Sequence, residues 1–195
     1  MNRVSFLALS LSLLAPPLFF AVLPQQAQVP GIDNHLAQEC VTVIAVRHAE
    51  KDRTERKDPK LTEAGVMRAR ELSRMLASSG VTHIYSTPYR RTRATVAPTA
   101  EAMKLEIQEY SPRDLSGFAK QLAGLPPGSV ALVAGHSNTT PSLVLALGGD
   151  IAELESLDGV PALGDTQYDR LFVTTLPPAG HRAKTIELRF GKETK

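Results

Sequence analysis

Residues 41–50 read Val-Thr-Val-Ile-Ala-Val-Arg-His-Ala-Glu, and the interpretation of the whole chain starts from this stretch. The first six residues are β-branched or apolar, a pattern typical of a strand buried on both faces of a parallel sheet. Arg47, His48 and Glu50 follow this strand directly. Ligands of open α/β sheets bind beyond the carboxyl ends of the strands, so the sequence places these side chains where a ligand site is expected.

Segments typical of helices and of strands alternate along the rest of the chain. Spacing and capping residues predict helices over residues 62–78, about 89–103, 115–122 and 140–147, and strands over 81–85, 105–110 and 130–134. Two further strands, 170–176 and 185–190, are expected to form an antiparallel pair at or near the sheet edge, after a loose stretch from 150. The fold class predicted is α/β, a three-layer α/β/α sandwich with a mostly parallel central sheet.

Composition limits the kinds of protein this chain can be. Its 195 residues indicate one domain, and 43% hydrophobic with 22% charged residues argues against wholesale disorder or a multi-span membrane protein. A net charge of +2 is too small to indicate a nucleic-acid partner. Cys40 is the one cysteine, which excludes an internal disulfide and any multi-cysteine metal site.

The first residues have the layout of a secretory signal. Arg3 precedes a charge-free, mostly apolar run over residues 4–23. That run is near the ~20 residues that span a bilayer, so an uncleaved anchor is the alternative, although Pro16 and Pro17 disfavour a continuous helix. We expect a signal peptide over 1–27, a linker over 28–39, a folded domain over 40–195, and a secreted or periplasmic location. Membrane contact is then expected only through an uncleaved N-terminal segment.

Three strand ends bring histidines and arginines to one rim of the predicted sheet. His48 follows the first strand, Arg91 lies after the second, and His136 follows the strand over 130–134. A guanidinium group matches phosphate oxygens two at a time, and fixed positive charge keeps a neighbouring imidazole neutral and nucleophilic. Such an imidazole can attack phosphorus and form a phosphohistidine. A metal site made by the two histidines is the alternative, disfavoured by the arginines and by the lack of a carboxylate partner.

Four segments in order resemble the motifs of the histidine phosphatase superfamily (phosphoglycerate-mutase-like), in particular its compact branch 1 members. They are Arg-His-Ala-Glu at 47–50, Leu-Thr-Glu-Ala-Gly at 61–65, Ser-Thr-Pro-Tyr-Arg-Arg-Thr-Arg-Ala-Thr at 86–95 and Gly-His-Ser at 135–137. The resemblance implies a phosphoglycerate-mutase-like fold with His48 as the phosphorylated nucleophile. It also implies that the phosphoryl group is bound by Arg47, Arg91 and His136, with Ser137 beside them.

The proton donor is the point at which the chain departs from larger family members. Those place an acid directly after the second histidine, where this chain has Ser137-Asn138. Smaller members take the donor from the segment before the last motif, so we expect Asp114 in that role, on a loop after a strand, with Glu109 as the next candidate. Compact phosphohistidine-type members offer a further alternative, in which a good leaving group departs without a dedicated donor.

The sequence therefore predicts an exported, metal-independent phosphomonoesterase that needs no cofactor. Its expected substrate is a phosphorylated small molecule, glycolipid or phosphoprotein, bound in an open cleft because the long cap insertions of acid phosphatases are missing. The alternatives are a phosphoglycerate-mutase-like phosphotransferase and a non-catalytic protein that binds a phosphorylated ligand. Outside the site, Glu50 is expected to neutralise a neighbouring arginine, and residues 52–60 to form a solvated loop.

Overall fold

The computed structural model describes residues 39–178 and 181–194. The segments predicted as signal peptide and as most of the linker, 1–27 and 28–38, lie outside the described residues. The described residues belong to one compact unit. In the part of the chain that is described, no helix has the length and apolar character needed to cross a membrane.

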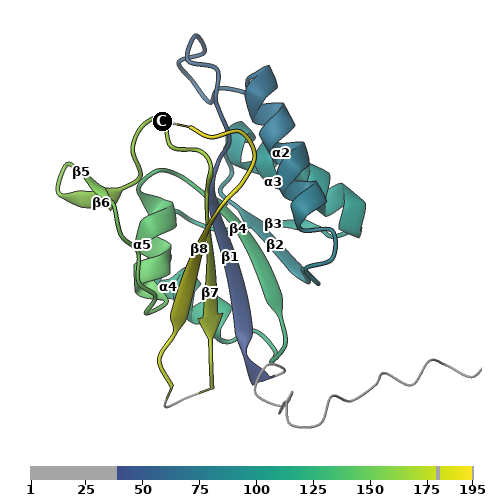
Figure 1. Cartoon of the computed structure of the whole chain (residues 1–195), viewed down its shortest axis with the longest axis vertical. Helices are drawn as coiled ribbons and strands as arrows, with labels where there is room; N and C mark the ends of the chain where they lie inside the picture. Colours follow the sequence, from purple (N-terminus) through teal and green to yellow (C-terminus); the bar gives the residue numbers. More distant parts are fainter. Residues whose placement is uncertain (1–38, 179–180, 195) are drawn as a thin grey trace, which may run out of the picture. The chain divides into compact units, whose positions relative to one another are not determined.

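The centre of the domain is a six-stranded sheet of order β3-β2-β4-β1-β7-β8 (Figure 1). Four neighbouring strands are parallel: β3 (Ile107–Glu109), β2 (His83–Ser86), β4 (Val130–Gly135) and β1 (Val41–Arg47). β7 (Arg170–Leu176) is antiparallel to β1, and the edge strand β8 (Lys184–Arg189) is antiparallel to β7. The predicted mixed sheet with an antiparallel pair at one edge is confirmed.

The helices lie in two layers, one on each face of the sheet (Figure 1). α2 (Glu63–Met75) and α3 (Arg90–Met103) cover one face, and α4 (Leu115–Ala123) and α5 (Thr139–Ala146) cover the other. Successive side chains of β1 point to opposite faces of the sheet, so each face has its own part of the core. Ile44 packs in the cluster that includes Leu72 of α2, whereas Val43 packs with Leu122 of α4. The three-layer α/β/α prediction is confirmed.

The register of the parallel strands brings their carboxyl ends level. Arg47 of β1 pairs with Gly135 of β4, and Ser86 of β2 pairs with Ala134 of β4. The segments that begin at His48, Thr87 and His136 therefore emerge side by side at one rim of the sheet.

A small hairpin lies within the stretch that the sequence analysis left without secondary structure. Its strands, β5 (Glu155–Leu157) and β6 (Val160–Ala162), form a separate two-stranded antiparallel sheet. Five of its six strand residues are exposed, so no hydrophobic period marks the strands. The available signal was the turn Asp158-Gly159, whose two positive φ angles, 52° and 80°, match the Asp-Gly preference of a tight hairpin turn.

Candidate active site

The backbone at the end of β1 fixes the position of His48. Its N–H donates to the Gly135 carbonyl at 2.9 Å, and the next N–H, that of Ala49, donates to the Thr95 hydroxyl at 2.9 Å. The imidazole Nδ1 lies 2.8 Å from the Ala49 carbonyl, which can only accept a hydrogen bond. Nδ1 therefore carries the proton, and in the neutral ring Nε2 keeps its lone pair free for nucleophilic attack.

His48 stays neutral at physiological pH because its charged form is disfavoured by the surroundings. Burial is the largest cause, and the positive charges of Arg47 and Arg91 add to it, so that the pKa of His48 falls to about 3. The hydrogen bond to the Ala49 carbonyl acts in the opposite direction without offsetting burial. The nucleophilic form is thus the resting form at pH 7.

His136, which follows β4, faces His48 across the rim. The two ring centroids lie 5.6 Å apart with an interplanar angle of 68°. Arg91 Nη2, which can only donate, lies 3.4 Å from Nδ1, so Nε2 carries the proton and donates to the Thr87 hydroxyl at 3.1 Å. Burial, followed by the charges of Arg91 and Arg47, lowers the pKa of His136 to about 4.

Arg47 is buried and is held from several sides by the loop that precedes β7. Its Nη1 donates to the carbonyls of Gly164 at 2.7 Å and Gln167 at 3.0 Å, and its guanidinium carbon lies 4.2 Å from the centroid of the Tyr168 ring. An Asp165 oxygen lies 3.7 Å from Nη2. The guanidinium group of Arg47 is therefore held in one orientation at the rim.

Arg91, at the start of α3, is held in a similar way from the opposite side. Its guanidinium carbon lies 4.6 Å from the centroid of the Tyr89 ring, and Nη1 lies 3.8 Å from an Asp58 oxygen. The Nε–H groups of both Arg47 and Arg91 are buried without a hydrogen-bond partner among the described residues. Buried donors that lack a partner are rare. The two guanidinium groups together supply the positive charge that an oxyanion in this space would need.

These side chains line a polar cavity of about 390 Å³. Arg47, His48, Arg91, His136 and Ser137 all contribute to it, so the structure brings together five of the residues that the sequence singled out. The remaining lining residues are Lys51, Tyr89, Pro112, Arg113, Asn138, Thr139 and Asp165. In the described part of the chain, no group of three or more His, Cys, Asp or Glu side chains could hold a metal ion.

The two carboxylates considered as proton donors do not line this cavity. Asp114 is the N-cap of α4, and its carboxylate accepts the N–H of Gly117 at 2.8 Å. Glu109 pairs with Arg93 at 2.7 Å and lines a neighbouring hollow of about 400 Å³, which shares Tyr89, Pro112 and Arg113 with this cavity. Pro112 and Arg113, which precede Asp114, are the residues of that loop that reach the cavity.

Four residues at the site were missed by the sequence analysis. Lys51 directly follows the first motif and Tyr89 lies inside the third, so their closeness in sequence to His48 and Arg91 was the available signal. Asp165 and Tyr168 come from the loop before β7, which carries no hydrophobic period, so only the tertiary structure brings them to Arg47.

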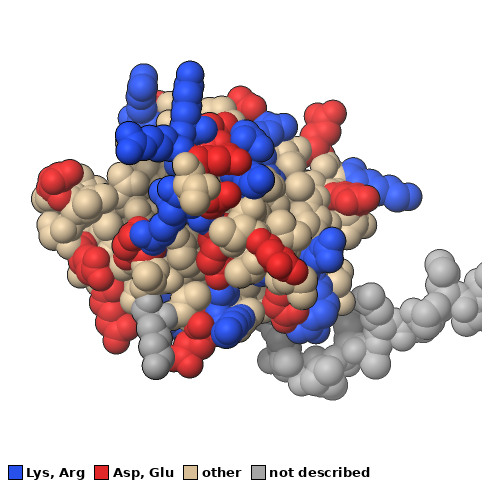
Figure 2. Space-filling view, turned by 90° about the horizontal axis from the view of Figure 1, so that it is seen from above, with Lys and Arg blue, Asp and Glu red and all other residues tan. Residues whose placement is uncertain are grey.

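A second cavity, of about 530 Å³, continues the first one outward along residues 51–59. The two cavities share Lys51, Tyr89, Arg91 and Asp165. Figure 2 looks down on this end of the molecule, where Lys and Arg side chains gather with Asp and Glu between them. The segment expected to be a solvated loop therefore also forms one wall of a charged groove at the mouth of the site.

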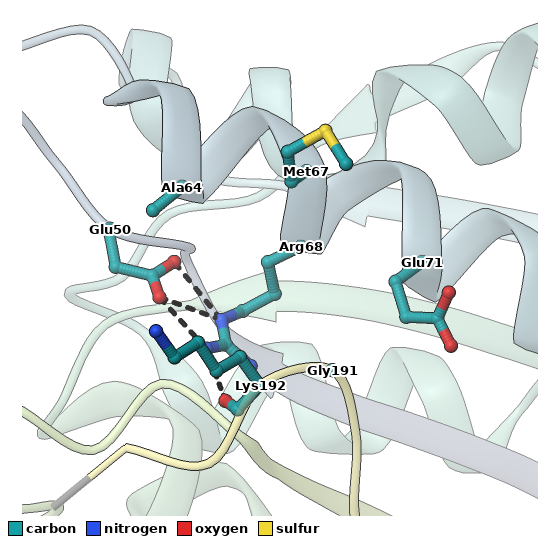
Figure 3. Close-up of a pocket in the computed structure, with 7 residues that line it drawn as sticks. All are labelled: Glu50, Ala64, Met67, Arg68, Glu71, Gly191 and Lys192. Carbon is teal, nitrogen blue, oxygen red and sulfur yellow. Dashed lines mark hydrogen bonds and ion pairs between the residues drawn. The ribbon is translucent and has the colours of Figure 1, made fainter.

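A third cavity, of about 550 Å³, lies apart from the rim, between α2 and the C-terminal segment (Figure 3). Its polar centre is the ion pair between Arg68 and Glu50, with Nε–O distances of 3.0 Å. Arg68 also donates to the carbonyls of Phe190 and Lys192, each at 2.7 Å, so all its nitrogens are engaged. The predicted role of Glu50, to neutralise an arginine, is confirmed, and this cavity is structural in character.

The fold and the rim define an α/β protein with a cavity, lined by two histidines and several cationic side chains, beyond the carboxyl ends of its parallel strands. Residues 43–111 match the family model of the histidine phosphatase superfamily, branch 1. This match includes the first three of the four motifs, and it agrees with the resemblance that those motifs indicated. A search of curated proteins found no match.

Solved structures of this superfamily have the same fold at low sequence identity. The protein histidine phosphatase SixA, complexed with tungstate, has a TM-score of 0.59 and 15% identity over 76% of this chain and 96% of its own. A mycobacterial glucosyl-3-phosphoglycerate phosphatase has a TM-score of 0.55 and 14% identity, with coverages of 76% and 97%. A phosphoserine phosphatase from Entamoeba histolytica, in a mutant form with phosphoserine, has a TM-score of 0.52 and 12% identity, with coverages of 77% and 96%.

Proposed function

We propose that the protein is a phosphatase that hydrolyses phosphomonoesters through a phosphohistidine formed on His48. One observation carries the proposal: His48, whose Nε2 is unprotonated, lines the same cavity as the guanidinium groups of Arg47 and Arg91. A phosphoryl group bound there accepts from both arginines and presents phosphorus to the nucleophile.

In the first step, Nε2 attacks phosphorus and the bond from phosphorus to the ester oxygen breaks. The leaving group departs with the electron pair of that bond, as an alkoxide or phenolate that takes up a proton. Arg47 and Arg91 stabilise the charge on the equatorial oxygens during transfer. His136 lines the same cavity, and we propose that it contacts the phosphoryl group as well.

In the second step, water attacks the phosphohistidine and the P–N bond breaks with its electron pair returning to Nε2. Both protons of the water leave with the product as dihydrogen phosphate, which releases one proton to solvent near pH 7. No step requires a metal ion, because the arginines supply the positive charge that a metal would otherwise provide.

The names of structurally similar proteins support this choice of chemistry. Tungstate, bound in the SixA structure, is a tetrahedral oxyanion like phosphate, and two further neighbours are named as phosphatases. We propose a phosphorylated small molecule, glycolipid or phosphoprotein as the substrate. The layout of residues 1–27 supports a secreted or periplasmic location, with the phosphatase domain beginning near Cys40.

The test is hydrolysis of 4-nitrophenyl phosphate by the purified protein with and without a chelator. We expect turnover that the chelator does not change and that His48→Ala lowers by about 10³-fold or more, because the nucleophile is lost. His181→Ala, an exposed histidine outside the described cavities, is the matched control and should keep full activity. Equal activity in the His48→Ala variant would remove this residue from the nucleophile role. Binding of phosphate without turnover in the wild type would favour a non-catalytic phospho-ligand-binding protein instead.

A further inference from the structure

Lys51 lies where the active-site cavity meets the outer groove, and it lines both. The ion pairs of the described residues within 4.0 Å do not include it. Burial and the charges of Arg91, Arg47 and Arg53 lower the pKa of its ammonium group, and Asp165 acts against this lowering. Lys51 is thus a cation at the mouth of the site without a carboxylate in contact.

The carboxylates of the groove are already engaged by other groups. Asp165 accepts from Arg53 at 2.8 Å, and Asp52 accepts from the backbone N–H and hydroxyl of Thr54 at 2.9 and 2.7 Å. Glu55 pairs with Lys60 and Arg90, and Asp58 accepts the backbone N–H of Arg90 at 3.0 Å. The positive charge of Lys51 is therefore available to a ligand that extends from the active-site cavity into the groove.

The lining of the active-site cavity offers no carboxylic acid to protonate a leaving group. Among its described lining residues the one carboxylate is that of Asp165, and its hydrogen bond with Arg53 holds the pKa of that carboxyl below its usual value. Asp165 is thus ionised at pH 7 and has no proton to give. Such a site favours leaving groups that depart unprotonated, since an alkoxide is a poor leaving group without a general acid.

We propose that the preferred substrate class is a diphosphate whose terminal phosphoryl group is transferred to His48 while Lys51 binds the second phosphate. This inference rests on the proposed phosphatase function. The second phosphate places a negative charge in the outer groove, where the ammonium group of Lys51 can bind it. It also leaves as a stable phosphate monoester that needs no proton from the protein.

The step balances in atoms and charge. His48 Nε2 attacks the terminal phosphorus of a diphosphate that carries three negative charges, and the bond from this phosphorus to the bridging oxygen breaks. The phosphate monoester leaves as a dianion with the electron pair on the former bridging oxygen, and the phosphohistidine carries the remaining negative charge. Lys51 stabilises the oxygen that gains charge. Water then releases inorganic phosphate as in the proposed monoesterase reaction.

The experiment compares methyl diphosphate, methyl phosphate and 4-nitrophenyl phosphate, with release of inorganic phosphate measured for each. In the wild type, kcat/KM for methyl diphosphate should exceed that for methyl phosphate by about 100-fold or more, because methoxide needs a proton to leave. Lys51→Met should lower kcat/KM for methyl diphosphate about 10-fold more than for 4-nitrophenyl phosphate, the size expected for one lost hydrogen bond to a charged group. Lys51→Arg should restore the preference, since a guanidinium keeps the charge but cannot give up a proton.

Lys57→Met is the matched control, because Lys57 lies exposed in the same loop and lines neither cavity. An equal loss on methyl diphosphate and 4-nitrophenyl phosphate in Lys51→Met would overturn the assignment and place Lys51 against the transferred phosphoryl group. No preference for the diphosphate in the wild type would also overturn it. If Lys51→Arg were as impaired as Lys51→Met, the charge-stabilising role of Lys51 would be overturned, and Lys51 would instead act by donating a proton to the leaving group. Each of these failures leaves His48-dependent hydrolysis of 4-nitrophenyl phosphate by the wild-type protein intact, so it is distinct from failure of the proposed function.

Discussion

Two imidazoles kept neutral beside two guanidinium groups are the central residue-scale feature of this protein. His48 and His136 have pKa values of about 3 and about 4, both well below the ordinary value of about 6.5. Burial dominates in each case, and the arginine charges add to it. The burial and the arginine charges that keep Nε2 of His48 nucleophilic therefore also oppose protonation of both histidines in the folded state.

This resistance predicts how the stability of the domain depends on pH. The folded histidines have depressed pKa values, so below about pH 6.5 the unfolded chain binds protons that the folded chain does not. Their contribution to the free energy of unfolding is complete above that pH and falls as the pH drops toward 4, by at most about 1.4 kcal/mol per pH unit for each histidine.

Urea denaturation at pH 7, 6 and 5 measures this effect. Replacing His48 by Gln removes one titrating group, so the loss of stability between pH 7 and 5 should be smaller in that variant than in the wild type. His181→Gln, at an exposed position, is the control and should keep the wild-type slope. A His48→Gln variant with an unchanged slope would contradict the depressed pKa.

At the residue scale, the sequence identified the charged centre of the site but not the groups that support it. Arg47 and His48 follow a recognisable strand, and the order of the motifs brought Arg91 and His136 to the same rim. The partners of Arg47, namely the Gln167 carbonyl and the Tyr168 ring, lie more than a hundred positions further along the chain. No local pattern encodes such a contact, because it depends on how the loop before β7 returns to the rim.

At the scale of elements, Asp114 illustrates how one side chain can suggest two roles. The sequence analysis proposed it as a proton donor, and the structure places its carboxylate at the N-terminus of α4, where it accepts the N–H of Gly117. An Asp at this position satisfies an otherwise unpaired backbone donor and suits the positive end of the helix. A capping role and a catalytic role predict different behaviour for the same substitutions.

We expect Asp114→Asn to retain stability and activity, because Asn caps a helix about as well as Asp, and Asp114→Ala to lower the free energy of unfolding by about 1 kcal/mol. Urea denaturation measures the stability of both variants. Hydrolysis of an alkyl and an aryl phosphate measures their activity and tests for proton donation, because loss of a general acid slows the poorer alkyl leaving group more. Selective slowing of the alkyl ester in Asp114→Asn would restore the proton-donor assignment.

The larger elements could be predicted because periodicity and caps agree along most of the chain. Thr62 was expected to cap a helix and does so by accepting the N–H of Gly65, and the buried run over 130–134 lies within β4. Short elements were harder to place. β3 has three residues rather than the six expected, since only Ile107–Glu109 pairs with β2. Sheet pairing rather than local propensity decides where such a strand ends.

At the scale of the whole molecule, the C-terminal segment is held by residues from the first half of the chain. Arg68 of α2 joins Glu50, two residues after the proposed nucleophile, to the carbonyls of Phe190 and Lys192 (Figure 3). Gly65 permits this approach, because a side chain there would collide with the Glu50 carbonyl. The sequence predicted a partner for Glu50 but not its identity, since the interaction needs three segments far apart in the chain.

The same network predicts a large effect from one substitution outside the site. Replacing Arg68 by Met leaves the largely buried Glu50 carboxylate without its cation and two carbonyls without their donor, which should lower the free energy of unfolding by about 3 to 5 kcal/mol. Combining Arg68→Met with Glu50→Gln should recover part of this loss, because the unpaired charge is removed. Arg74→Met on the same helix breaks only an exposed pair with Glu71 and should change stability little. Urea denaturation of the wild type, Arg68→Met, Glu50→Gln and the double variant measures the coupling. Equal stability of the Arg68→Met and Arg74→Met variants would show that the C-terminal segment is not held by Arg68.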